Sequence, residues 1–192
     1  MRISRGLAAV VAAGAACALA APSDGAFITA NFPLSGAQEA PPNDADAFGV
    51  GTIVVDTTAK TFNLDLFVVG IGLTDLLGVG PNSSPVHIHN APAGANGPIV
   101  IDLGFFGSFV EDGLGITLSL RDIAFGGVQG GISSDIDSNL EQLFLGALYV
   151  NIHTNDFPGG EIRGQIVGPE IPTPGAAWLF ALGGFVALRR RR

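Results

Sequence analysis

Short runs of β-branched and aromatic residues, broken at close intervals by Gly, Pro, Asn and Asp, constrain the fold of this chain more than any other feature. The pattern predicts an all-β protein, because the first group favours strands and the second favours turns. We expect a single antiparallel β-sandwich of the Greek-key or immunoglobulin-like kind, of which the superoxide-dismutase-like sandwich is one form. The expected strands cover residues 27–34, 49–56, 61–69, 86–89, 99–103, 115–120, 148–153 and 161–167.

Local patterns refine this expectation at three places. Apolar and polar residues alternate along residues 61–69, so this strand should turn its leucines toward the core. A capping box that starts at Ser138 predicts one short helix over residues 138–146. Residues 125–137 carry several glycines and little apolar pattern, which indicates a loop over the rim of the sandwich.

The N-terminus has the layout of a secretory signal peptide. Two arginines precede an apolar run, and the small residues Ala18 and Ala20 match the pattern that signal peptidase accepts. We therefore expect residues 1–20 to be removed on export. The single cysteine, Cys17, lies inside this segment, so the remaining chain has neither a disulfide nor a thiol nucleophile.

The C-terminus carries a three-part tail over residues 171–192. Pro172 and Pro174 come first, an apolar stretch over residues 175–188 follows, and the chain ends with four arginines. As a helix the apolar stretch would rise only about 21 Å, against a hydrocarbon thickness of ~30 Å, so it is a marginal transmembrane helix.

This tail resembles the PEP-CTERM sorting signal of Gram-negative bacteria, although Ile171 and Thr173 replace the Val and Glu of the usual motif. The resemblance assigns the sorting signal to Pro172, Pro174, Arg189, Arg190, Arg191 and Arg192. It implies that an exosortase-type enzyme recognises and removes the tail after transient anchoring in the inner membrane, which leaves the protein at the cell surface or in the extracellular matrix. A simple C-terminal membrane anchor is the alternative.

Charge is distributed unevenly along the chain. Between the two ends only Lys60, Arg121 and Arg163 are basic, against all 17 acidic residues, so this part has a formal charge of −14. Such a surface repels phosphate backbones, which excludes nucleic-acid recognition.

The three histidines fall in two strand-like motifs and form the candidate metal site. His87 and His89 are two residues apart and share a face of one strand, and His153 comes from another. Three imidazoles can bind copper or zinc. The alternative is that these rings only hydrogen-bond to backbone and carboxylate groups at the sandwich edge.

No motif predicts an enzyme. A nucleophile elbow, a phosphate loop and a dinucleotide fingerprint are all absent from the sequence. Glu161 and Arg163 alternate with Ile162, so we expect both to point to one face of the last strand and to form an ion pair with each other or with neighbours.

Several motifs resemble the CHRD domain, which is named after chordin. They are FPLSGAQEAPP at residues 32–42, HIH at 87–89, GPIV at 97–100, LYVNIHT at 148–154 and FPGGEIRGQ at 157–165. The resemblance implies a β-sandwich used in extracellular settings, without established catalysis or an agreed ligand. We expect the domain to cover residues 27–168.

The histidine pattern is also similar to the copper ligands of the copper-zinc superoxide dismutases, with His87, His89 and His153 in those roles. Those enzymes need further histidines and a cysteine pair, so dismutase activity is not expected here.

Two hypotheses follow from the sequence. The first is an exported, non-catalytic module for adhesion or scaffolding, with extracellular polysaccharide or surface proteins as partners. The second is a copper or zinc metalloprotein that uses the three histidines.

Overall fold

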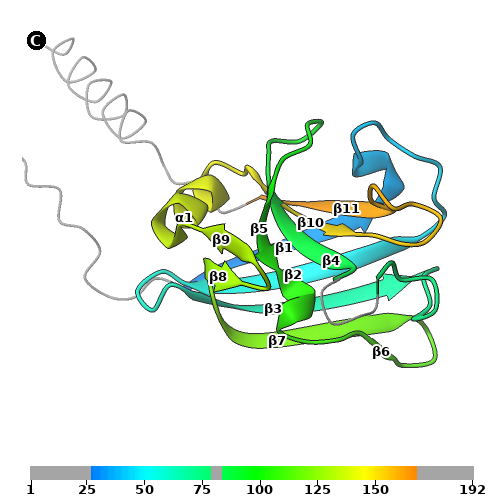
Figure 1. Ribbon diagram of the computed structural model, residues 1–192, viewed down its shortest axis with the longest axis horizontal. Helices are drawn as coiled ribbons and strands as arrows, with labels where there is room; N and C mark the ends of the chain where they lie inside the picture. The colour runs from blue at the N-terminus through cyan, green and yellow to red at the C-terminus, as the bar shows by residue number, and fades with distance from the viewer. Residues whose placement is uncertain (1–26, 79–83, 168–192) are drawn as a thin grey trace, which may run out of the picture.

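The apolar runs pair into a nine-stranded antiparallel sheet in the computed structural model (Figure 1), which describes residues 27–78 and 84–167. Every predicted strand is present, with ends that differ by a few residues. The elements are β1 (Phe27–Ser35), η1 (Gly36–Gln38), β2 (Phe48–Asp56), β3 (Thr61–Val69), β4 (Val86–Asn90), β5 (Ile99–Asp102), η2 (Leu103–Phe105), β6 (Val110–Glu111), β7 (Ile116–Ala124), β8 (Gly127–Gln129), β9 (Ile132–Ser134), α1 (Ile136–Phe144), β10 (Leu148–Ile152) and β11 (Ile162–Ile166).

The large sheet curls back on itself and so forms both layers of a sandwich. Its strand order is β5-β4-β10-β11-β1-β2-β3-β7-β6. β1 pairs with β2 along its whole length but meets β11 at the single register pair Ser35 and Arg163. The sheet turns at this corner, so the half that contains β4, β10 and β11 faces the half that contains β2, β3 and β7 (Figure 1). The predicted all-β sandwich is confirmed.

The core lies between the two halves and is filled by alternate residues of each strand. In β3, Phe62, Leu64, Leu66 and Val68 are buried while the residues between them are more exposed, as the alternation predicted. Removing such side chains from water contributes roughly 1.5–3 kcal/mol each. Packing alone can therefore hold a fold that has no disulfide in this region.

The predicted short helix is present with shifted bounds, and one local prediction, the loop over residues 125–137, was partly wrong. The helix begins two residues earlier than expected, because the carboxylate of Asp135 accepts the backbone N–H of Ser138 and so takes the capping role assigned to Ser138. Part of the stretch predicted as a loop forms the β8–β9 hairpin. Gly130 and Gly131 both have positive φ and close this hairpin, whereas in the sequence they suggested only irregular chain.

The predicted targeting segments, residues 1–20 and 171–192, lie outside the described residues, as do the terminal helices expected there. Within the described part of the chain, no helix is both long enough and apolar enough to span a membrane.

Candidate metal centre

Two neighbouring strands position the three histidines. β4 and β10 are antiparallel partners, and their apolar residues Ile88 and Val150 point into the core. The alternation of a strand therefore sends His87 and His89 to the opposite face of the sheet. His153 follows directly after the end of β10. Residues more than 60 positions apart in the sequence thus meet because β4 pairs with β10.

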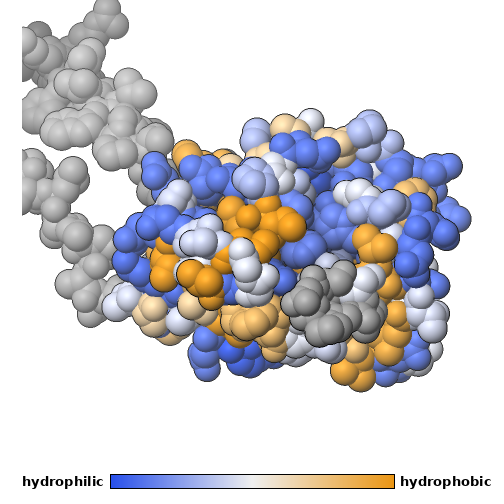
Figure 2. All heavy atoms as spheres, viewed as in Figure 1, coloured by the Kyte–Doolittle hydropathy of each residue, from blue (hydrophilic) through white to orange (hydrophobic). Residues whose placement is uncertain are grey.

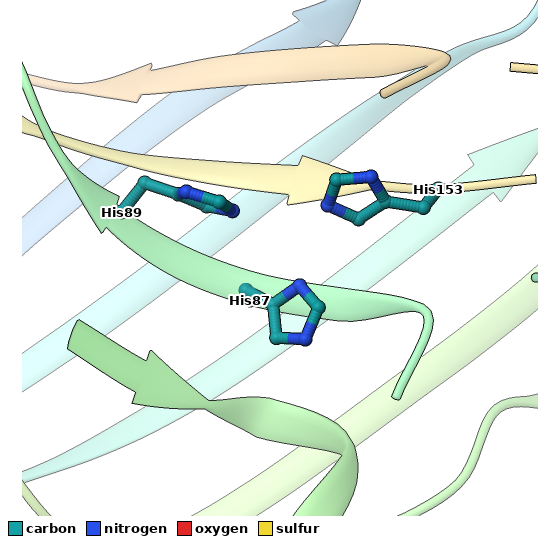
Figure 3. A group of neighbouring side chains, drawn as sticks. All are labelled: His87, His89 and His153. Atoms are coloured by element: carbon teal, nitrogen blue, oxygen red, sulfur yellow. The ribbon is translucent and has the colours of Figure 1, made fainter. Parts of the chain in front are cut away.

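The three rings converge on one space, as Figure 3 shows. The ring centroids of His87 and His153 are 5.2 Å apart, those of His87 and His89 5.6 Å, and those of His89 and His153 5.9 Å. Potential ligand atoms of the three residues all lie within 4.8 Å of one another. The fold thus brings the three candidate residues together, and among the described residues this is the one such cluster.

Each ring has a nitrogen that is free to bind an ion. His89 Nδ1 is 3.0 Å from the carbonyl oxygen of Gly97, and His153 Nδ1 is 3.1 Å from that of Pro158. A carbonyl can only accept, so both Nδ1 atoms carry the proton and both Nε2 atoms have lone pairs. His89 Nε2, His153 Nε2 and His87 Nδ1 are buried without a hydrogen-bond partner. Buried polar atoms are rarely left in this state without a ligand.

The rings are uncharged at neutral pH. Burial lowers the pKa of His87 to about 4, aided by the neighbouring His153 and His89 and opposed by Asp102. Burial also lowers the pKa of His89 to about 4, against the hydrogen bond to Gly97. The pKa of His153 is lowered by burial as well. Neutral imidazole is the form that binds a metal ion, so the ligands need not lose protons first.

Behind His89 lies a stack of planar groups. The ring of Tyr149 is parallel to that of His89 within 13°, with centroids 5.0 Å apart. The guanidinium of Arg163 covers Tyr149, with its central carbon 3.5 Å from the ring centroid. Cations favour this position because the face of an aromatic ring is negative. The imidazole, the phenol and the guanidinium therefore form three layers.

The peptide of Gly97 holds two of these layers in place. Its carbonyl accepts the proton of His89 Nδ1, and its N–H donates to the hydroxyl oxygen of Tyr149 at 3.2 Å. A side chain at this position would collide with the carbonyl of Asn90. Only glycine allows the backbone to approach the two rings this closely.

Arg163 ties the loop that contains Gly97 to the sheet. Its guanidinium donates to the carbonyls of Ala95 and Pro92 at 2.7 and 3.0 Å, and to Gln165 Oε1 at 2.7 Å. The predicted pairing with Glu161 was wrong. Glu161 precedes β11 and accepts the hydroxyl of Thr154 at 2.5 Å instead.

A buried carboxyl group, that of Glu39, lies near Asn151 and interacts with the charge of Arg163. Burial raises the pKa of Glu39 to about 7, although the charge of Arg163 and a hydrogen bond from Asn151 lower it. Its Oε1 and the Asn151 Oδ1 are buried without a partner. Atoms of both side chains lie within 2.7 Å of the position that a Cβ on Gly160 would occupy. Glycine at this position therefore leaves room for them.

The family model of the CHRD domain matches residues 30–166 of this sequence, which is more than half of the chain. The chain belongs to the CHRD domain family. No curated protein and no solved structure matches it. The motifs that carried the resemblance meet in one polar layer of this CHRD domain, on the outer face of β4, β10 and β11. This layer contains the histidines, Tyr149, Asn151, Arg163, Gln165 and Glu39.

Sequence reasoning found the three histidines but missed the groups around them. Tyr149 lies two positions before Asn151 in the second histidine motif. The sequence could therefore have predicted that both side chains lie on one face of the strand. Gly97 carried no signal beyond a turn. Its role depends on the approach of a loop to two strands, which local patterns do not contain.

Proposed function

We propose that this CHRD domain binds one copper or zinc ion through His87, His89 and His153. The observation that carries the proposal is the set of three buried ring nitrogens that share one space and lack hydrogen-bond partners. Three histidines with an open fourth position are a known zinc arrangement, and imidazole suits copper equally well. Carbonyl oxygens on the second nitrogens of two rings supply the outer support that such ligands usually have.

The donor set fits an ion with little movement. Metal–nitrogen distances of about 2.0 to 2.1 Å place two ligands roughly 3.4 Å apart in a tetrahedral site. The ligand atoms already lie within 4.8 Å of one another, so small ring rotations would complete the site. His87 and His153 are partly exposed, which gives the ion a route from solvent.

The test is metal analysis of the purified full chain with copper and zinc titration. We expect one equivalent, and His87→Ala, His89→Ala and His153→Ala should each weaken binding about a hundredfold or more, since each removes a ligand. Gln129→Ala is the matched control, because it removes a buried polar side chain of β8 that is not part of the histidine cluster. Binding that survives all three histidine substitutions would contradict this site.

Export and display form a second part of the proposal. Membership in the CHRD family fits an exported protein, and the leader-like N-terminus and sorting-type tail point the same way. A role in adhesion or scaffolding is supported by apolar side chains on the outside of the domain, which Figure 2 shows over β8 and β9 and over β6. Val110 on β6 and Val128 on β8 are 62% and 81% exposed.

Cell fractionation checks this part. We expect the chain at the cell surface or in the matrix, shortened at both ends. Replacement of Arg189, Arg190, Arg191 and Arg192 by Ala should leave the protein in the membrane fraction with its tail attached. Recovery of the intact chain from the cytosol would contradict export.

A further inference from the structure

We propose that the ion in this site is monovalent copper, and that the stack of His89, Tyr149 and Arg163 disfavours a divalent ion. This proposal rests on the proposed function and goes one step further, because it names the ion and its charge. The geometry of the ligands and of the fixed charges around them carries it.

The ligands supply no negative charge. Among the described residues the cluster consists of three histidines, and neither a carboxylate nor a thiolate joins it. The protons on His89 Nδ1 and His153 Nδ1 go to neutral carbonyls, so no carboxylate increases the electron density of these rings. An ion in this site would thus keep its whole charge, and a divalent ion would keep twice as much as Cu⁺.

The fixed charge behind the site is a cation. Arg163 is 0% exposed, and its guanidinium is stacked on Tyr149, which is stacked in turn on the ligand ring of His89. Repulsion between buried charges grows in proportion to the charge of the ion, so it acts more strongly on Zn²⁺ and Cu²⁺ than on Cu⁺.

Two carboxyl groups oppose this effect. Glu39 interacts with the charge of Arg163, and it is about half protonated at pH 7 because burial raises its pKa to about 7. Asp102 pairs with His87 across β4 and β5, and its effect on the pKa of His87 is the smallest of those acting there. The balance between these carboxyl groups and Arg163 decides the preference, and variants of Arg163 and Asp102 measure it.

Coordination number favours the same ion. Zinc sites are almost always four-coordinate, so a three-histidine zinc site must add water. Imidazole ligands suit copper as well as zinc. The site lies in a largely buried layer, with His89 only 8% exposed.

The experiment compares the affinities of the full chain for Cu⁺, Cu²⁺ and Zn²⁺. The metal-free protein is titrated with each ion in competition with a chromophoric chelator, without oxygen for Cu⁺. We expect one equivalent of Cu⁺ that binds at least about tenfold more tightly than either divalent ion. Tighter binding of Zn²⁺ or Cu²⁺ would overturn this inference and leave the proposed metal site standing, whereas no binding of any ion would overturn both.

Two variants test the cause of the preference. Arg163→Met should reduce the preference for Cu⁺ over Cu²⁺ about tenfold, which lowers the reduction potential by about 59 mV. Asp102→Asn should change the preference in the opposite direction, and Asn can still cap η2. Asp102 is partly exposed at the surface, so this second variant keeps the test valid if Arg163→Met fails to fold. An unchanged preference in Asp102→Asn and in a folded Arg163→Met would show that these charges do not select the ion.

Discussion

Replacement of Arg163 by Met is expected to lower the free energy of unfolding of the metal-free domain by about 4 kcal/mol. The side chain is fully buried, donates three hydrogen bonds and covers the ring of Tyr149. Met fills a similar volume but leaves the carbonyls of Ala95 and Pro92 without their donor. Chemical denaturation at pH 7 measures the loss, and thermal unfolding should shift down by roughly 12 to 16 °C.

Arg121→Met is the matched control for this substitution. Arg121 also donates to backbone carbonyls and forms an ion pair with Asp65 at 2.7 Å, but both side chains are half exposed. Exposed ion pairs contribute about 0 to 1 kcal/mol, so this variant should stay within 1 kcal/mol of the parent. Equal losses in the two variants would show that the buried network around Arg163 has no special role in stability.

The contrast between these two arginines shows where sequence reasoning reaches its limit. Each follows a buried apolar residue on a strand, and this pattern does not show which of the two is buried. Arg163 is buried because the loop that contains Pro92 and Ala95 covers its face of the sheet, a contact between residues about 70 positions apart. Strand periodicity identifies the face of the sheet on which a side chain lies but not what covers that face.

The same limit explains the outcome for the site. His87 and His89 were predictable as a pair because two residues on one strand share a face. Their meeting with His153 depends on the pairing of β4 with β10, which residues 91–147 separate in the chain. The pattern that defines single strands contained no information on that pairing. Likewise, the capping role of Asp135 was missed because Ser138 offered an equally good local signal.

Acidification of the metal-free protein from pH 6.5 to pH 4.5 is expected to cost about 2 kcal/mol of stability. The pKa values of His87 and His89 are about 4 in the folded protein and near 6.5 when unfolded. Over this range the unfolded chain binds more protons, so stability falls as the pH falls. The two rings together contribute a loss of about 4 kcal/mol.

Glu39 acts with the opposite sign and sets the net effect. Its pKa is about 7 in the folded protein and near 4.5 when unfolded, so the folded state binds the extra proton between these values. Stability from this group is complete below about pH 4.5 and is lost as the pH rises through 7. Protonation of Glu39 on acidification therefore raises the free energy of unfolding by about 2 to 3 kcal/mol. The Glu39→Gln variant should lack this stabilisation, so the stability of the variant should fall about twice as steeply as that of the parent between pH 6.5 and 4.5. Denaturation series with a chelator present measure both slopes. If the stability of the parent protein does not change over this range, the histidines protonate freely in the folded state. That result would contradict the buried, uncharged rings on which both metal proposals are based.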